Sequence, residues 1–141
     1  MSRVFWDTML IIYLLEGNPA FRPRADALLA RSRRRGDALF TSCLAVAEVM
    51  AGVERFDQPL KAAAVQETLE EIGFQFLPFD LGSMRPFGYL RGREKLKVAD
   101  AIHLACAASA GIDLFLTGDD RITKLDLPGI QFIVDFNAGI L

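Results

Sequence analysis

Four acidic residues lie beside predicted strand ends and helix starts, where they could hold a metal ion for hydrolysis of a phosphodiester bond. Asp7 and Asp119 each follow a short apolar run typical of a strand, and Glu48 and Asp100 lie near the start of a helix-like stretch. Carboxylates gathered at short range repel one another and raise each other's pKa. A bound Mg²⁺ or Mn²⁺ ion, which prefers carboxylate oxygen, removes that cost. We therefore expect a metal-dependent nuclease if the fold brings these four residues together.

The four carboxylates are expected to have different roles. One or two divalent ions can activate a water molecule and neutralise charge on the phosphoryl oxygens. Asp7, which leaves a strand, and Asp100, in the first turn of a helix, are expected to bind the ion directly. Glu48 and Asp119 would complete the pocket, bind a second ion or orient a water molecule. Because a helix N-terminus favours negative charge, we expect Asp100 to stay ionised without metal.

Polar side chains near these carboxylates are expected to support them through hydrogen bonds. Three hydroxyl groups are candidates: Thr8, Ser42 and Thr117. His103 lies three positions after Asp100 and so faces roughly the same side of the helix. A structural hydrogen bond is favoured for His103 over a role as general base, because a metal ion would already activate the water.

Each acidic residue also has a purely structural interpretation. Asp7 would cap a helix, Asp100 would complement the helix dipole, and Asp119 would form a turn with Asp120. Glu48 is different, because its helix segment is apolar and no basic residue is near it in sequence. A carboxylate in such a segment is rarely buried without a partner or a metal. The sequence leaves open which of Asp119 and Asp120 faces the site.

The composition is that of a compact globular protein, with 52% hydrophobic and 24% charged residues in a chain of 141. This length predicts a single domain over residues 1–141. With a net charge of −2 and a pI near 5.4, a nuclease would need local basic patches. Cys43 and Cys106 are interpreted as small buried hydrophobes in a reducing cytosol, and no disulfide is expected.

Short apolar runs alternate with helical patterns along the chain. Strands are predicted at 3–6, 37–41, 74–79, 113–117 and 131–134. Helices are predicted at 8–15, 21–35, 42–52, 58–72, 97–110 and 120–125, with a further helical stretch beginning at 80. This alternation predicts an α/β domain with a mainly parallel, twisted sheet flanked by helices. Ligands of such sheets bind beyond the carboxyl ends of the strands, where Asp7 and Asp119 fall.

The apolar run from Met9 to Leu15 is too short to span a membrane, which takes about 20 residues. No small-residue cleavage site follows it, so it does not match a signal peptide. We interpret the run as part of a buried strand-to-helix unit in a soluble cytoplasmic protein. Four of its side chains are expected in the core or at a dimer interface: Leu10, Ile11, Tyr13 and Leu14.

Together these contexts resemble a known family. Phe5-Trp6-Asp7-Thr8 and the apolar run after it resemble the opening of a PIN-domain ribonuclease, and Thr41-Ser42 with Glu48 resembles its second acidic motif. The segment 96–105, with Asp100, resembles the third motif, and 116–119 resembles the fourth. The likeness covers nearly the whole chain in order, with the third motif the most specific. One departure is Met9, where the family often has a small polar residue.

The resemblance implies a PIN-like three-layer sandwich and a VapC-type toxin of a toxin–antitoxin pair. It implies a Mg²⁺- or Mn²⁺-dependent endoribonuclease in which Asp7 and Asp100 bind the metal most directly and Glu48 and Asp119 complete the pocket. It also implies a homodimer and a cognate VapB-type antitoxin whose C-terminal segment covers the active-site groove. The RNA target, its cleavage position and the number of metal ions are not determined by the sequence.

Two groups of basic residues could contact an RNA backbone. The first leads into the helix of Asp100 and consists of Arg85, Arg91, Arg93, Lys95 and Lys97. This group is equally consistent with a site that contacts RNA phosphates and with a solvated surface loop. The second, Arg31 with Arg33–Arg35, closes a helix, where its charge complements the helix dipole; that interpretation is favoured over RNA contact.

Two other classes of α/β protein do not match the first acidic motif. A response-regulator receiver domain needs an acidic pair after the first strand, and a haloacid-dehalogenase-like phosphatase needs Asp-x-Asp; Trp6-Asp7-Thr8-Met9 provides neither. The remaining alternative is a PIN-like module that binds RNA or protein without cleaving it. Four acidic residues argue against that alternative, because a pure binder of a polyanion gains nothing from a negative pocket.

Overall fold

The computed structural model describes residues 1–56 and 60–138. Its centre is a sheet with the strand order β3-β2-β1-β4-β5, in which every pairing is parallel. The strands are β1 (Arg3–Trp6), β2 (Ala38–Ser42), β3 (Phe74–Leu77), β4 (Ile112–Thr117) and β5 (Ile130–Asp135). The predicted parallel α/β arrangement is therefore confirmed.

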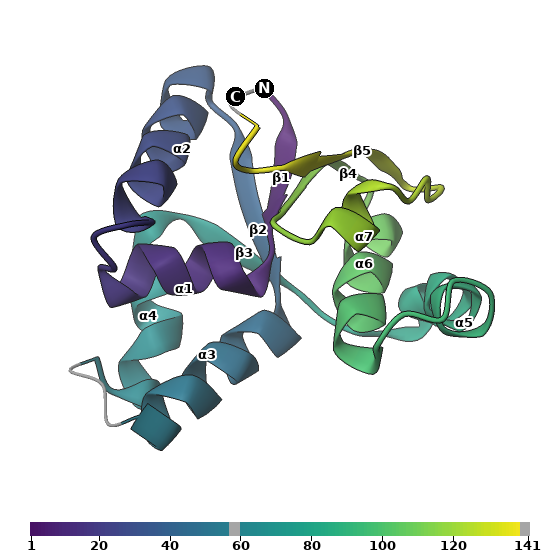
Figure 1. Cartoon of the computed structure of the whole chain (residues 1–141), viewed down its shortest axis with the longest axis horizontal. Helices are drawn as coiled ribbons and strands as arrows, with labels where there is room; N and C mark the ends of the chain where they lie inside the picture. The colour runs from purple at the N-terminus through teal and green to yellow at the C-terminus, as the bar shows by residue number, and fades with distance from the viewer. Residues whose placement is uncertain (57–59, 139–141) are drawn as a thin grey trace.

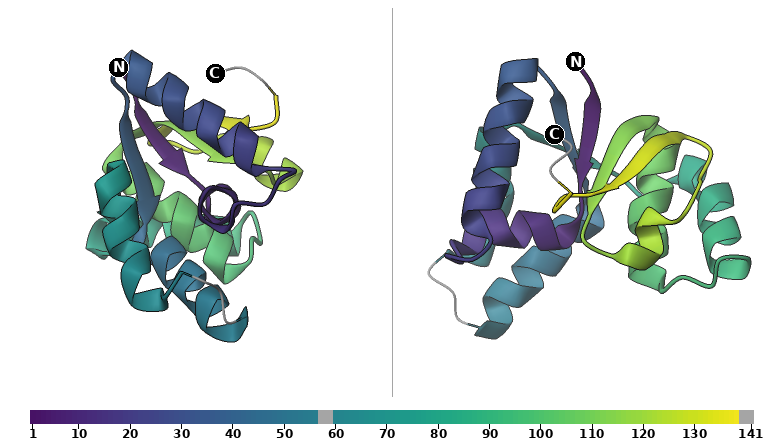
Figure 2. Two further views of the ribbon diagram at one scale, coloured as in Figure 1. Left: turned by 90° about the vertical axis from the view of Figure 1, so that its left-hand side faces the viewer. Right: turned by 45° about the horizontal axis from the view of Figure 1, so that its top comes forward.

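Helices cover both faces of this sheet and complete a three-layer sandwich (Figures 1 and 2). One face carries α1 (Thr8–Glu16), α2 (Arg22–Arg35), α3 (Cys43–Phe56) and α4 (Ala62–Ile72). The other face carries α5 (Met84–Gly92), α6 (Val98–Ala110) and α7 (Asp120–Thr123), and a short 3-10 turn, η1 (Leu81–Ser83), precedes α5. None of the helices in the described ranges is long and apolar enough to cross a membrane.

Alternation along β1 divides the hydrophobic core in two. Trp6 packs into the cluster beneath α1–α4, while Phe5 packs into the cluster beneath α5–α7. Successive side chains of a strand point to opposite faces, and all three residues from Val4 to Trp6 are fully buried. Burial on both faces explains why this strand has a continuous apolar sequence.

Most predicted helix ends agree with the structure to within one residue. Asp7 caps α1, and Gly17 ends it in the left-handed conformation at φ 70°. Gly111 ends α6 in the same way at φ 71°. Glycine adopts this conformation without the steric cost that a Cβ brings.

Several predictions about these elements were wrong or only partly right. Strand β3 ends at Leu77 and α7 ends at Thr123, each two residues before its predicted end. Helix α3 continues past Gly52 to Phe56, because Val53 extends the apolar stripe that packs against the core. Helix α4 begins at Ala62, and its predicted start at Gln58 lies outside the described residues. Cys43 is exposed at the start of α3, whereas Cys106 is buried as expected; both are free thiols.

Candidate active site

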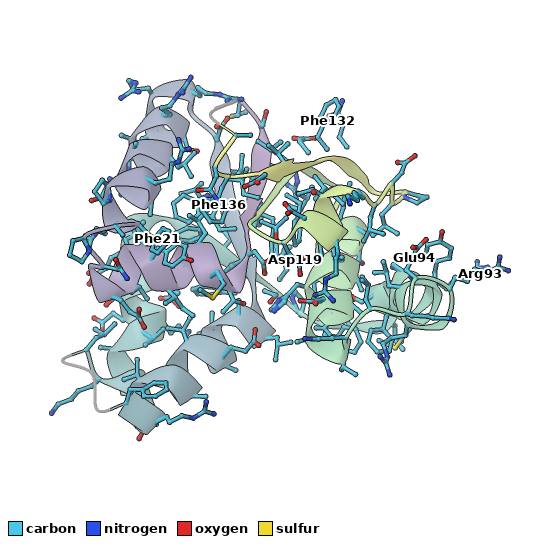
Figure 3. The ribbon with its side chains drawn as sticks, in the orientation of Figure 1. Phe21, Arg93, Glu94, Asp119, Phe132 and Phe136 are labelled. Carbon is cyan, nitrogen blue, oxygen red and sulfur yellow. The ribbon has the colours of Figure 1, made fainter. Side chains whose placement is uncertain are left out.

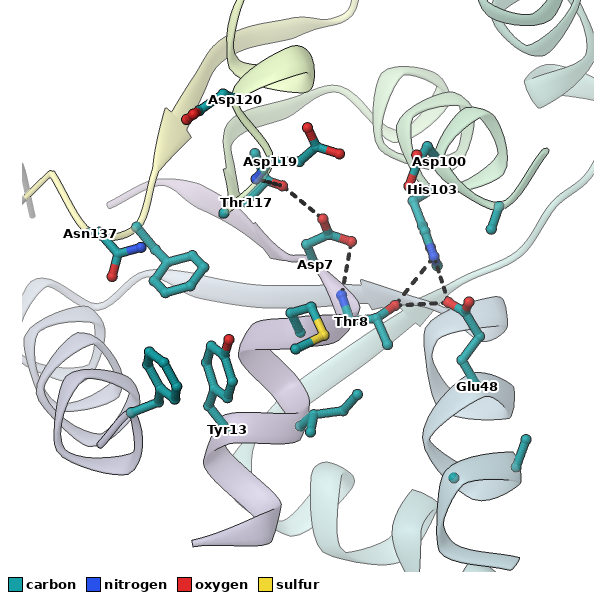
Figure 4. A pocket seen from close by; sticks show the side chains of 18 of the residues that line it. Asp7, Thr8, Tyr13, Glu48, Asp100, His103, Thr117, Asp119, Asp120 and Asn137 are labelled. Atoms are coloured by element: carbon teal, nitrogen blue, oxygen red, sulfur yellow. Dashed lines mark hydrogen bonds and ion pairs between the residues drawn. The ribbon is translucent and has the colours of Figure 1, made fainter. Parts of the chain in front are cut away.

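The four predicted carboxylates line one cavity of about 920 Å³ at the carboxyl ends of the strands (Figure 4). Asp7 lies between β1 and α1, and Asp119 lies between β4 and α7. Because β1 and β4 are neighbours in a parallel sheet, their carboxyl ends bring these two residues to the same edge. Asp100 enters from the first turn of α6, and Glu48 enters from α3.

Asp7 is held in place through both carboxylate oxygens. Its Oδ1 accepts a hydrogen bond of 2.9 Å from the backbone N–H of Thr8, and its Oδ2 accepts one of 2.8 Å from the Thr117 hydroxyl. The Asp7 N–H continues the β1–β4 ladder by donating to the carbonyl of Leu116 at 3.0 Å. Asp7 therefore caps α1 and faces the cavity at once, so the structural and functional interpretations apply to the same side chain.

Glu48 has the partner that the sequence did not reveal. His103, which is 3% exposed, lies with Nε2 at 2.8 Å from Glu48 Oε1, and the Thr8 hydroxyl donates to the same oxygen at 2.9 Å. The hydrogen bond from His103 lowers the pKa of the Glu48 carboxyl below its ordinary value, although partial burial opposes this. The partner is 55 residues away, and only the spacing of His103 and Asp100 on one helix face hinted at it.

Ser42 does not contact a carboxylate, contrary to expectation. Its Oγ lies 2.6 Å from His103 Nδ1 and accepts a hydrogen bond of 2.9 Å from the N–H of Ala45. These contacts assign the proton of a neutral imidazole to Nε2, because the Ser42 hydroxyl can then donate to Nδ1 while Nε2–H donates to Glu48. His103 therefore makes the structural hydrogen bonds that the sequence favoured.

Asp100 experiences the repulsion expected of clustered carboxylates. Partial burial and the negative charges of Asp7 and Asp119 raise the pKa of the Asp100 carboxyl above its ordinary value. Burial and repulsion therefore oppose the effect of the helix N-terminus, which was the effect expected from the sequence.

Asp119 pairs with a cation that was not predicted. The Arg121 guanidinium lies 2.9 Å from Asp119 Oδ2 and 3.9 Å from Asp100 Oδ2, so it approaches two of the four carboxylates. The hydrogen bond from Arg121 lowers the pKa of the Asp119 carboxyl. Asp119 also caps α7 through Oδ1. Asp120 lines the same cavity, but Figure 4 shows its side chain turned away from Asp7 and Asp100.

Two of the carboxylates remain suited to a divalent ion. Within residues 1–56 and 60–138, no group of three or more His, Cys, Asp or Glu side chains is arranged to hold a metal. Glu48 is engaged by His103, and Asp119 is engaged by Arg121. Asp7 and Asp100 provide hard oxygen donors whose mutual repulsion a cation would relieve, and Mg²⁺ commonly binds through only one or two protein carboxylates. The donor chemistry therefore fits Mg²⁺ or Mn²⁺ at this pair.

The basic residues that precede α6 lie away from this cavity. None of Arg85, Arg91, Arg93 and Lys95 is among the residues that line it, and Figure 3 shows Arg93 far from Asp119. The stretch is also not a simple loop, because α5 includes Arg85 and Arg91. Arg91 donates to the carbonyl of Leu96 at 2.7 Å, and Arg85 lines a different cavity.

Tyr13, which was predicted in the core or at a dimer interface, packs partly buried against the core cluster beneath α1–α4 and also lines the cavity. Its neighbours Leu10, Ile11 and Leu14 are buried as expected. The helical repeat explains the difference, because Tyr13 shares a face of α1 with the cavity-lining residues Met9 and Ile12.

A family comparison identifies this architecture. Residues 4–127 match the model of the PIN domain. The chain belongs to the PIN-domain family. No curated protein matches the chain by sequence.

Solved structures with the same fold include members of toxin–antitoxin complexes. A toxin–antitoxin complex from Klebsiella pneumoniae is 24% identical with a TM-score of 0.63, covering 92% of this chain and 95% of that one. VapBC from Salmonella typhimurium bound to DNA is 19% identical with a TM-score of 0.68, covering 96% and 99%. VapBC2 from Rickettsia felis bound to a promoter DNA fragment is 16% identical with a TM-score of 0.66, covering 94% and 97%.

Proposed function

We propose that this PIN-domain protein is a metal-dependent endoribonuclease, a VapC-type toxin that a cognate VapB-type antitoxin inhibits. The observation that carries the proposal is the pair Asp7 and Asp100, two carboxylates that face one cavity and destabilise each other without a cation. The assignment to VapC-type toxins is supported by the similar fold of proteins in solved toxin–antitoxin complexes. From the family resemblance of the sequence we also propose that the toxin forms a homodimer.

Asp7 and Asp100 would hold Mg²⁺ or Mn²⁺, which supplies an activated water and neutralises charge on the phosphodiester. Thr117 and the N–H of Thr8 fix the orientation of the Asp7 carboxylate, which would hold the ion. Each of these supporting hydrogen bonds reduces the freedom of a ligand that must be in place before the substrate arrives.

Glu48 is prepared to orient a water molecule. His103 and Thr8 both hydrogen-bond to Oε1, and within the described residues no side chain hydrogen-bonds to Oε2. With its pKa lowered, the carboxylate stays ionised at neutral pH and can accept a hydrogen bond at Oε2. Arg121, beside Asp119, limits the repulsion that the remaining carboxylates exert on an approaching phosphate.

The experiment is cleavage of a mixed RNA pool by antitoxin-free protein with Mg²⁺, Mn²⁺ or EDTA. We expect cleavage that requires the metal and that Asp7→Asn and Asp100→Asn abolish while the circular dichroism spectrum is unchanged. Asp26→Asn is the matched control, because Asp26 is exposed on α2 and does not line the cavity. Undiminished cleavage by both purified Asp7→Asn and Asp100→Asn proteins would overturn the assignment.

A non-catalytic module that binds RNA or protein is the second candidate. It is favoured by one observation: His103 and Arg121 already engage two of the four carboxylates. Calorimetric titration with Mn²⁺ separates the candidates. If the protein is a nuclease, it binds Mn²⁺ and loses that binding on Asp7→Asn. If it neither binds Mn²⁺ nor cuts RNA, the second candidate is supported.

A further inference from the structure

The cavity that holds the carboxylates has an aromatic end. Tyr13 and Phe21 are stacked, with ring centroids 4.3 Å apart and an interplanar angle of 14°. Phe136 meets Tyr13 edge-on, at 6.0 Å and 68°. All three rings line the same cavity as Asp7 and Asp100, and Phe21 is 40% exposed. A large aromatic side chain is therefore open to solvent beside the site.

The aromatic end and the carboxylate end are joined by rigid elements. Asp7 caps α1 and Tyr13 follows six residues later, which places them about 9 Å apart along the helix axis. On the other side, Phe136 packs directly on the turn before Asp119, because a Cβ on Gly118 would lie 2.8 Å from its ring. Figure 3 shows Phe21, Phe136 and Asp119 in succession across the molecule. The two ends of the cavity are therefore held at a fixed separation by α1 and by the turn that Phe136 covers.

Polar groups stand around the rings. Arg55 from the end of α3 and Asn137 after β5 both line the cavity. An amide can donate to and accept from the edge of a base, and a guanidinium attracts a phosphate. A purely apolar side chain of a protein partner would leave these groups without matching contacts. A nucleotide, with its flat face, polar edges and anionic backbone, matches all three features.

We propose that Phe21 and Tyr13 form a stacking site for one unpaired base of single-stranded RNA, next to the phosphodiester that is cut. This inference rests on the proposed nuclease function and deepens it by assigning a base-binding site to Phe21 and Tyr13. Bases stack on aromatic side chains only when they leave the stack of a helix, so paired RNA cannot use the site. The site therefore takes an unpaired base and tolerates different bases, because every base has a flat face.

Binding measurements test the site without depending on cleavage. The protein carries Asp7→Asn, which removes a proposed metal ligand, and the probe is a short fluorescent single-stranded RNA of mixed sequence, followed by anisotropy. We expect Phe21→Ala to weaken binding about tenfold, as loss of one stacked base does, and Phe21→Trp to preserve it. The same RNA annealed to its complement should bind more weakly and be insensitive to Phe21→Ala.

Phe132→Ala is the matched control. Phe132 is 60% exposed on β5 and does not line the cavity, so its loss removes a similar ring from a different surface (Figure 3). Phe21→Ala should fold normally, because the N-terminal turn of α2 uses the backbone of Phe21, whose carbonyl accepts from Ala25 N at 3.2 Å. Equal thermal midpoints for the two variants verify this.

The outcomes distinguish this inference from the proposed function. Binding that depends on Phe21, in a protein that never cleaves RNA, supports the stacking site and overturns the nuclease. Metal-dependent cleavage with RNA affinities unchanged by Phe21→Ala supports the nuclease and overturns the stacking site. If Phe21→Ala leaves RNA binding unchanged but abolishes inhibition by the antitoxin, the occupant is a protein side chain and the inference is wrong.

Discussion

Each carboxylate of the cavity has a different nearest partner, and that partner determines how readily the group loses its proton. A guanidinium stands beside Asp119 and an imidazole beside Glu48, and both lower the pKa of the acid that they contact. For Asp100, burial and the charges of two neighbouring acids raise the pKa and outweigh the opposing effects of His103 and Arg121. Residues of one chemical type are thereby prepared for different tasks within a single cavity.

Removing the charge of Asp100 should stabilise the metal-free protein. Because the folded-state pKa of Asp100 is raised, the folded protein binds more protons than the unfolded chain, and stability falls as pH rises through that range. Asp100→Asn removes this effect, so in EDTA we expect its thermal midpoint to exceed the wild-type value by a few degrees at neutral pH. The gain should disappear in acid, below the ordinary pKa of an aspartate. A constant gain at every pH would point to a cause other than ionisation.

Removing His103 should destabilise the fold and change the ionisation of Glu48. His103→Ala leaves a buried gap and removes the partner of Ser42 Oγ, which we expect to cost roughly 1–3 kcal/mol in urea denaturation. Because His103 lowers the pKa of Glu48, its loss should move the acidic limb of the cleavage profile to higher pH. An unchanged limb together with lost stability would mean that His103 only fills space.

At the scale of elements, short connections between strands and helices fix the positions of the cavity carboxylates. β1 passes into α1 through Asp7 alone, and β4 passes into α7 through Gly118 and Asp119. A connection this short leaves each carboxylate little freedom, because both of its neighbours are fixed by secondary structure. The turn before β5 is similarly tight, since Gly129 lies against the carbonyl of Ala108 in α6.

Gly129→Ala should destabilise this turn strongly. A Cβ at Gly129 would lie 2.5 Å from the oxygen of Ala108, and the residue has φ of +98°, which a side chain disfavours. Strain and overpacking together should cost about 2–4 kcal/mol in chemical denaturation. Gly88→Ala in α5 is the matched control, since nothing lies within 4 Å and alanine favours a helix by about 1 kcal/mol. Equal stability of the two variants would contradict the close approach.

At the scale of the whole molecule, one parallel sheet joins two hydrophobic cores. The strands carry alternate side chains into the cluster under α1–α4 and the cluster under α5–α7. Phe5 and Phe115 stack at 4.6 Å in the second cluster, while Trp6 lies in the first. Because the two cores share these strands, a loss of packing on one face of the sheet should also lower the stability of the other face.

Phe115→Ala should therefore destabilise both faces together. Removing a fully buried phenylalanine typically costs about 3–5 kcal/mol. Trp6 is the single tryptophan, and its fluorescence reports the face opposite to the substitution. We expect the fluorescence and circular dichroism transitions to coincide at a lower urea midpoint. Separate transitions would show that the two cores unfold independently.

The order of strands and helices, the parallel sheet and the four cavity carboxylates could be predicted from the sequence, because each depends on local patterns. Apolar runs, glycine stops such as Gly111 and the positions of Asp7 and Asp119 after strands are all readable within a few residues. Parallel strands then bring their carboxyl ends to one edge whatever the details of packing.

The partners of those carboxylates were decided by the tertiary structure. His103 meets Glu48 across 55 residues, and a guanidinium can reach two acids only once α6 and α7 are packed side by side. The aromatic end of the cavity likewise requires α1, α2 and the segment after β5 to converge on Tyr13. Contacts of this kind depend on the distance and direction of side chains from separate elements, which no local pattern of residues encodes.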